Sequence, residues 1–77
     1  EQRDSDAQNS LGNCYEYGEG IEKNIEKAIE YYKLSANQGN ADAQFNLGVC
    51  YENGEGIENN IEKAIEYYKL SANQGYS

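Results

Sequence analysis

The sequence predicts an all-α protein, an α/α solenoid of two helix-turn-helix repeats with four antiparallel helices. Residues 4–39 and 40–75 agree at 29 of 36 positions, and a self-similar period of this length is typical of helical solenoids. Within each copy, apolar residues recur at spacings of three and four, which is the period of a helix. Glycine pairs interrupt this pattern at the same place in both copies, where they indicate a turn.

The first helix of each copy is expected to begin after Asp4 or Asn40 and to end at "GEG", residues 18–20 or 54–56. Asp and Asn are preferred N-cap residues, and glycine commonly ends a helix. The residues with helical spacing predict a buried stripe in each copy: Ala7, Leu11, Cys14 and Tyr15, and then Ala43, Leu47, Cys50 and Tyr51.

Gly12 and Gly48 fall inside these first helices. Glycine costs about 1 kcal/mol relative to alanine in a helix interior. We therefore expect the second helix of each copy to approach closely at this point.

The second helix is expected to begin after the N-cap Asn24 or Asn60 and to end at "NQG", with Gly39 or Gly75 as the stop. Its residues form an apolar face at helical spacing. The predicted face consists of Ile25, Ala28, Ile29, Tyr32 and Ala36, repeated as Ile61, Ala64, Ile65, Tyr68 and Ala72.

The segment "ADAQFNLGVCYENGEGIENNIEKAIEYYKLSANQG" resembles a Sel1-like repeat, a relative of the tetratricopeptide repeats. The pattern A-x-x-x-L-G-x-x-Y-x-x-G-x-G, then K-A, an aromatic pair, an Ala and Q-G, recurs in both copies. Tyr31 and Tyr67 stand where the family often has Trp, and the family's frequent Pro before Asn24 is missing. The resemblance implies one repeat segment over 1–77, with repeats at 4–39 and 40–75, that starts a right-handed superhelix.

Composition argues against several classes of partner. The net charge of −8 opposes nucleic-acid binding, because phosphate contacts depend on Lys and Arg. A partner attracted by charge is expected to be basic. No apolar run approaches the roughly 20 residues of a membrane span, so direct membrane insertion is not expected. The chain contains no Met, which suggests a fragment of a longer array.

The residues that usually carry chemistry are missing. There is no His, the commonest general base and metal ligand. A calcium loop needs an acidic residue at its first position and Gly at its sixth, but Gly56 in the sixth place puts Tyr51 in the first. As a phosphate cradle, "GEG" lacks a following Lys and puts Glu where the anion would bind. We therefore predict no enzyme, no cofactor and no metal, with "GEG" as a connector.

Cys14 and Cys50 occupy equivalent positions, one repeat apart. Packed helices lie roughly 8–10 Å apart, whereas a disulfide needs Cα atoms within about 7 Å. Both thiols are therefore expected to be free, buried and unreactive. The few cysteines and the absence of N-x-S/T sequons favour a cytoplasmic compartment, while an ER-lumenal or other setting of a parent protein stays open.

The positions at which the copies differ suggest a recognition surface. Residues 9, 13 and 17 share one helical face, as do 45, 49 and 53. Resemblance to tetratricopeptide-type solenoids implies that this face lines a concave groove. We name as candidate partner-binding residues Asn9, Asn13, Glu16, Tyr17, Phe45, Val49, Glu52 and Asn53. Polar capping of a first repeat would also explain Asn9 and Asn13, and both explanations stay open.

The predicted function is protein–protein interaction, as a non-catalytic scaffold or adaptor that presents a concave helical surface to a peptide or partner domain. The alternative is a purely structural spacer within a larger multidomain protein. The resemblance implies roles in assembling signalling or membrane-associated complexes. Because about three repeats are usually needed to bury a solenoid core, we also expect self-association through the C-terminal repeat face, with Tyr67, Tyr68, Leu70 and Ser71 turned outward.

Overall fold

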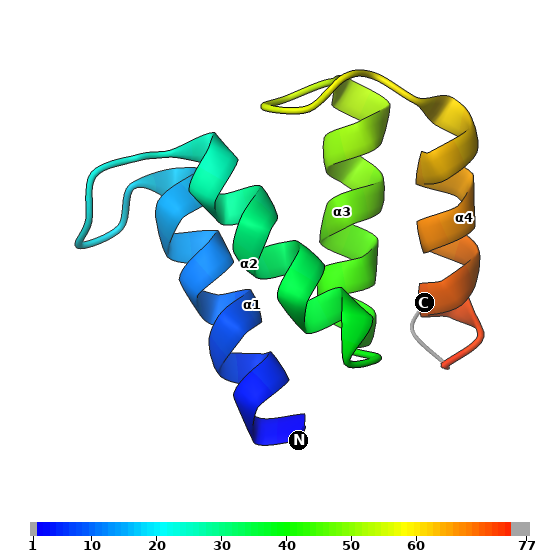
Figure 1. Ribbon diagram of the computed structural model, residues 1–77, viewed down its shortest axis with the longest axis horizontal. Coiled ribbons are helices and arrows are strands. Elements are labelled where there is room, and N and C mark those ends of the chain that lie inside the picture. The colour runs from blue at the N-terminus through cyan, green and yellow to red at the C-terminus, as the bar shows by residue number, and fades with distance from the viewer. Residues whose placement is uncertain (1, 75–77) are drawn as a thin grey trace.

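The computed structural model describes residues 2–74 and contains four helices: α1 Gln2–Tyr17, α2 Ile25–Asn37, α3 Ala41–Asn53 and α4 Ile61–Ala72. α1 and α2 form one antiparallel hairpin, α3 and α4 form the next, and α2 packs against α3 (Figure 1). The two longer links lie at one end of the molecule and the short α2–α3 link at the other. The prediction of two helix-turn-helix repeats is therefore confirmed.

Asparagine side chains cap three of the helices, as predicted. Each accepts a hydrogen bond from a backbone N–H in the first turn, which would otherwise lack a partner. The pairs are Asn24 with Lys27 N at 3.1 Å, Asn40 with Ala43 N at 2.9 Å and Asn60 with Lys63 N at 3.1 Å.

α1 begins at Gln2, two residues before the N-cap predicted at Asp4. In the second copy, Gly39 has a φ of +88° and turns the chain just before Asn40. In the first copy Arg3 stands at the position of Gly39, and Gln and Arg are good helix formers, so the helix extends further toward the N-terminus.

The "GEG" links are tight connectors. Their glycines have φ values of 68° or 69°, which residues with a Cβ rarely adopt. Each link is closed by a backbone hydrogen bond, from Asn24 N to Tyr15 O at 2.8 Å and from Asn60 N to Tyr51 O at 3.0 Å. The prediction that the glycines turn the chain is confirmed.

The glycines inside α1 and α3 allow close helix packing. A Cβ on Gly12 would lie 2.6 Å from Tyr32 Cε1, and one on Gly48 would lie 2.6 Å from Tyr68 Cε1. Both distances are far shorter than a van der Waals contact. Glycine therefore allows the tyrosine ring of the second helix to cross the first helix at close range, as predicted.

Stacked tyrosines join the helices of each hairpin. The rings of Tyr15 and Tyr31 stack with centroids 5.8 Å apart, and those of Tyr51 and Tyr67 repeat the arrangement at 5.8 Å. These four tyrosines thus pack the two helices of each hairpin together.

The hydrophobic core lies mainly on the two inner helices, α2 and α3. Its buried residues are Ala28, Ile29, Tyr32, Ala36, Ala43, Leu47, Cys50, Tyr51 and Ala64. The stripes predicted for the inner helices are confirmed, apart from Ile25, which is half-buried at the edge.

The stripes predicted for the outer helices are largely wrong. In α1, Ala7 is exposed and Leu11 is 40 % exposed, whereas Leu47 in the second copy is fully buried. In α4, Ile61 and Ile65 are 50 % and 47 % exposed. The physical reason is that among residues 2–74 only α2 and α3 have helices packed on both sides.

The outward surface of α4 also differs from the prediction. Ser71 is buried, because its Oγ donates to Ala41 O of α3 at 2.9 Å, and Tyr67 and Tyr68 are half-buried. Leu70 is 48 % exposed, but its equivalent Leu34 is 49 % exposed on a helix that does have a following repeat. This leucine position therefore faces solvent in both copies.

Candidate partner-binding surface

The predicted recognition stripe consists of eight residues, four on α1 and four on α3. Those on α1 are Asn9, Asn13, Glu16 and Tyr17, and those on α3 are Phe45, Val49, Glu52 and Asn53. The exposed members are Tyr17, Phe45, Glu52 and Asn53; the half-buried ones are Asn13, Glu16 and Val49; Asn9 is buried. The stripe is thus accessible at its C-terminal end on α1 and over most of α3.

Tyrosine hydroxyls from the second helices hold the glutamates of the stripe. Tyr32 OH lies 2.6 Å from Glu16 Oε1 and 2.6 Å from Asn13 Oδ1. In the second copy, Tyr68 OH donates to Glu52 Oε1 at 2.7 Å. Because a hydroxyl carries one proton, the Glu16 carboxylate is the preferred acceptor in the first copy. The same tyrosine–glutamate hydrogen bond therefore orients one carboxylate in each repeat.

Both hydroxyls remain donors over a wide pH range. Burial, with the hydrogen bond to Glu16 and its negative charge, raises the pKa of Tyr32 well above its usual range. Burial and the hydrogen bond to Glu52 raise the pKa of Tyr68 to about 12. The carboxylates of Glu16 and Glu52 therefore keep a fixed hydrogen-bond donor at neutral pH.

Tyr17 forms an exposed aromatic corner at the end of α1, and its side chain is 67 % exposed. The negative charge of Glu16, followed by burial and the charges of Glu55 and Glu19, raises its pKa. Glu55 lies in the second link, so carboxylates from both repeats contribute to the negative potential at Tyr17. An exposed aromatic ring beside carboxylates can receive a cationic side chain.

A polar seam between α1 and α3 was not predicted. Asn46 Nδ2 donates to Asn9 Oδ1 at 3.0 Å, and Asn40 Nδ2 donates to Asp6 Oδ1 at 2.7 Å and Ser5 Oγ at 3.2 Å. Four of these five residues stand at positions where the two copies differ. Those mismatches were the signal that could have revealed the seam.

The two thiols are free, as predicted, but differ in burial. Cys50 is 3 % exposed, and burial, together with the charges of Glu16 and Glu55, raises its pKa to about 12. The prediction that Cys14 is buried is wrong, because it is half-buried on the outer helix α1. Cys50 is therefore protonated at neutral pH and lacks the thiolate that nucleophilic chemistry requires.

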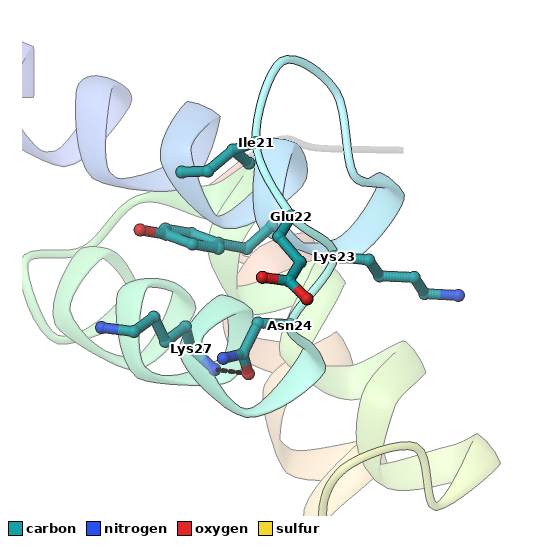
Figure 2. A pocket seen from close by; sticks show the side chains of 6 residues that line it. Ile21, Glu22, Lys23, Asn24 and Lys27 are labelled. Carbon is teal, nitrogen blue, oxygen red and sulfur yellow. Dashed lines mark hydrogen bonds between the residues drawn. The ribbon is translucent and has the colours of Figure 1, made fainter.

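A pocket of about 360 Å³ lies outside the stripe, between the end of α1 and the start of α2. In Figure 2 the side chains of Lys23 and Lys27 extend in opposite directions, and Glu22 lies between them. Lys27 Nζ lies 5.9 Å from the centre of the Tyr15 ring, a distance at which a cation is attracted to the ring. This arrangement provides no converging set of charges for a ligand.

Acidic side chains are abundant but are not grouped as metal ligands. Over the described part of the chain, no three His, Cys, Asp or Glu side chains are placed so that they could hold one ion. None of the helices between residues 2 and 74 is long and apolar enough to cross a membrane.

Comparison with known proteins gives matches over both copies. The sequence pattern of the Sel1 repeat matches residues 5–40 and 41–76. A putative sel1-like repeat-containing protein, R815 of Acanthamoeba polyphaga mimivirus, is 54 % identical over 35 residues, which is 46 % of this chain and 6 % of that protein.

Two solved structures share the fold. A Sel1 repeat protein from Oxalobacter formigenes superposes with a TM-score of 0.93 at 45 % identity, over 97 % of this chain and 31 % of that one. The protective antigen c5321 from uropathogenic Escherichia coli strains, which displays an SLR fold, gives 0.90 at 35 % identity, over 92 % and 15 %. The chain thus spans less than a third of the length of each of these relatives.

Proposed function

Because the chain belongs to the Sel1 repeat family, we propose that it is a non-catalytic scaffold or adaptor that presents the α1–α3 face to a peptide or partner domain. Sel1 repeats are generally protein-interaction scaffolds. The partner we propose carries basic residues, because the net charge of −8 attracts cations and repels nucleic acid.

The observation that carries this proposal is the repeated tyrosine–glutamate pair. Tyr32 holds Glu16 and Tyr68 holds Glu52, at 2.6 and 2.7 Å. A carboxylate that is already oriented loses less conformational entropy when it binds an Arg or Lys side chain. The exposed ring of Tyr17 lies next to Glu16, so a partner's cation can contact charge and aromatic surface together.

The test uses an immobilised library of Arg- and Lys-containing peptides, each with a matched peptide in which Gln replaces the basic residues. The double variant Glu16→Gln/Glu52→Gln keeps an amide oxygen for each tyrosine hydroxyl but removes both charges. Peptides that bind the parent chain are expected to bind this variant about tenfold more weakly. Leu34→Ala, which changes an exposed side chain away from the stripe, should leave binding unchanged.

Two results would contradict the adaptor proposal. One is that basic peptides bind no better than their Gln-matched counterparts. The other is that the double variant binds them as well as the parent chain, with equal helicity by circular dichroism. Either result would favour the alternative of a structural spacer inside a larger, possibly signalling, protein.

We also propose self-association through the C-terminal repeat face. We now assign this face to the half-exposed Ile61 and Ile65 of α4, in place of the residues that the sequence predicted to turn outward. Water-exposed apolar surface of this kind gains free energy when it is covered. Sedimentation from micromolar to millimolar concentration tests the proposal. A mass that rises with concentration is expected, and a constant monomer mass would contradict it.

A further inference from the structure

The two repeats meet through a contact that can be described residue by residue. Gly56 of the second link packs against Ile25 and Ile29 of α2, so closely that a Cβ at this position would collide with Ile25. Gln44 Nε2 of α3 donates to Ala36 O of α2 at 3.2 Å. The contact buries Ile29 to 5 % exposure. One side of the contact is thus a pair of isoleucines, and the other is the first helix and link of the next repeat.

The isoleucine side of this contact recurs uncovered on α4. Ile61 and Ile65 are the equivalents of Ile25 and Ile29. They are 50 % and 47 % exposed. We call this pair, together with the exposed Ala72, the back face.

The opposite side of the contact recurs uncovered on the first repeat. Gly20, the equivalent of Gly56, has no atom within 4 Å of the place its Cβ would occupy. Leu11 is 40 % exposed, although its equivalent Leu47 is fully buried. We call Ala7, Leu11 and Gly20 the front face.

We infer that the back face of one chain binds the front face of a second copy, and so repeats the α2–α3 contact between molecules. This inference rests on the proposed self-association, and it identifies the front face as the surface that binds the C-terminal repeat face. Near-identity of the two repeats carries the inference, because four of these six exposed residues have buried counterparts within the chain: Ile29, Ala36, Ala43 and Leu47. Ile61 and Ile65 of one molecule would pack against Gly20 of the next, as Ile25 and Ile29 pack against Gly56 within the chain.

The geometry also fixes the form of the assembly. A front-to-back contact joins two different surfaces, so each added molecule offers a new free face. Such an assembly grows open-ended, whereas a contact between two back faces would stop at a dimer. The distinction can be measured.

The polar seam of the internal contact is not repeated between molecules. Within the chain, Asn40 Nδ2 donates to Asp6 Oδ1 at 2.7 Å. Asp4, the counterpart of Asn40, is a carboxylate inside α1 rather than an amide at an N-cap. The intermolecular contact therefore lacks this hydrogen bond and is expected to be weaker than the internal one.

The decisive experiment mixes two blocked variants. Ile61→Glu/Ile65→Glu blocks the back face, and Leu11→Glu blocks the front face. All three positions are at least 40 % exposed, and circular dichroism checks that both variants fold. The parent chain is expected to sediment as a growing series of oligomers and each variant alone as a monomer. Their equimolar mixture should form a dimer that grows no further, since only one complementary pair of faces remains.

Other outcomes overturn the inference in distinct ways. If the front-blocked variant alone forms dimers, the back faces bind each other. If the back-blocked variant alone self-associates, the back face is not the contact. A parent chain that stays monomeric overturns self-association itself. None of these outcomes tests the peptide-binding proposal, because the blocked positions lie outside the stripe. Leu34→Glu, at a leucine exposed in both repeats, is the matched control and should assemble like the parent.

Discussion

Asn46 in α3 donates from Nδ2 to Asn9 Oδ1 in α1 at 3.0 Å, although the two asparagines occupy different positions in the repeat. Asn9 corresponds to Phe45, and Asn46 corresponds to Ser10. A first copy identical to the second would place Phe at position 9, which has no polar group for Asn46. The differences between the copies at these positions therefore serve contact between the repeats.

A double-mutant cycle tests this contact. Asn9→Ala and Asn46→Ala should each lower the free energy of unfolding by about 1 kcal/mol, because each leaves a partly buried amide without its partner. Together they should cost less than the sum, with a coupling of about 1 kcal/mol. Urea denaturation measures all four chains. Asn53→Ala, an exposed position on α3, is the control and should change stability by less than about 0.5 kcal/mol; additive effects at 9 and 46 would contradict the pairing.

The sequence predicts the helices and their ends well because those signals are local. Asn24 caps a helix through its own side chain three residues along, and Gly39 turns the chain through its own φ. Periodicity also identifies which residues share a face. It does not show whether a neighbour covers that face, and for this reason Leu11 and Ile65 were wrongly placed in the core while Leu47 and Ile29 were correctly placed there.

The candidate surface was predictable only in outline. Spacing places Asn9, Tyr17 and Glu16 near one side of α1. Which of them meets another helix depends on contacts between residues far apart in sequence, such as Tyr32 with Glu16 and Asn46 with Asn9. No local pattern encodes these pairs, although the mismatches between the copies mark some of the positions involved.

The two helical glycines should respond differently to alanine. Gly12 and Gly48 each face a tyrosine ring at the same short distance, but Tyr32 is fully buried, whereas Tyr68 is half-buried on the outer helix. Alanine gains about 1 kcal/mol in helix propensity, and overpacking costs roughly 1–3 kcal/mol when the ring cannot move. We expect Gly12→Ala to lower the free energy of unfolding by about 2 kcal/mol and Gly48→Ala to be close to neutral.

Urea or thermal unfolding of both variants measures this difference. Circular dichroism at low temperature confirms that the helices are kept. Equal losses of stability at the two positions would show that Tyr68 is held as tightly as Tyr32, and that the outer position of α4 gives its ring no freedom.

The thiols should label at different rates in the folded chain. Cys14 is half-buried, while Cys50 is 3 % exposed with its pKa raised to about 12. Because the thiolate is the reactive form, iodoacetamide at mildly alkaline pH should modify Cys14 first, and both should react rapidly in urea. Mass spectrometry follows the reaction, with Cys14→Ser and Cys50→Ser identifying each site. Equal native rates would mean that the α2–α3 core opens readily.

The free energy of unfolding should fall on the alkaline side. The pKa of the Cys50 thiol is raised, mainly by burial, from 9.0 to about 12 in the folded chain. Above pH 9 the unfolded chain therefore loses this proton while the folded chain keeps it, so stability decreases as pH rises. This contribution is complete below pH 9 and lost by about pH 12. The raised pKa values of Tyr32 and Tyr68 add a further decrease above the usual tyrosine value of 10.0.

Urea denaturation at a series of pH values separates the thiol from the tyrosines. Cys50→Ala should reduce the loss of unfolding free energy between pH 9 and pH 10. In this range the Cys50 thiol loses its proton in the unfolded chain but keeps it in the folded chain, whereas the hydroxyls of Tyr32 and Tyr68 are still largely protonated in both. Leu34→Ala, at an exposed position, removes no titratable group and should keep the parent's slope. If Cys50→Ala keeps the full decrease, the buried thiol does not bind its proton more tightly in the folded state, and another group must account for the loss of stability.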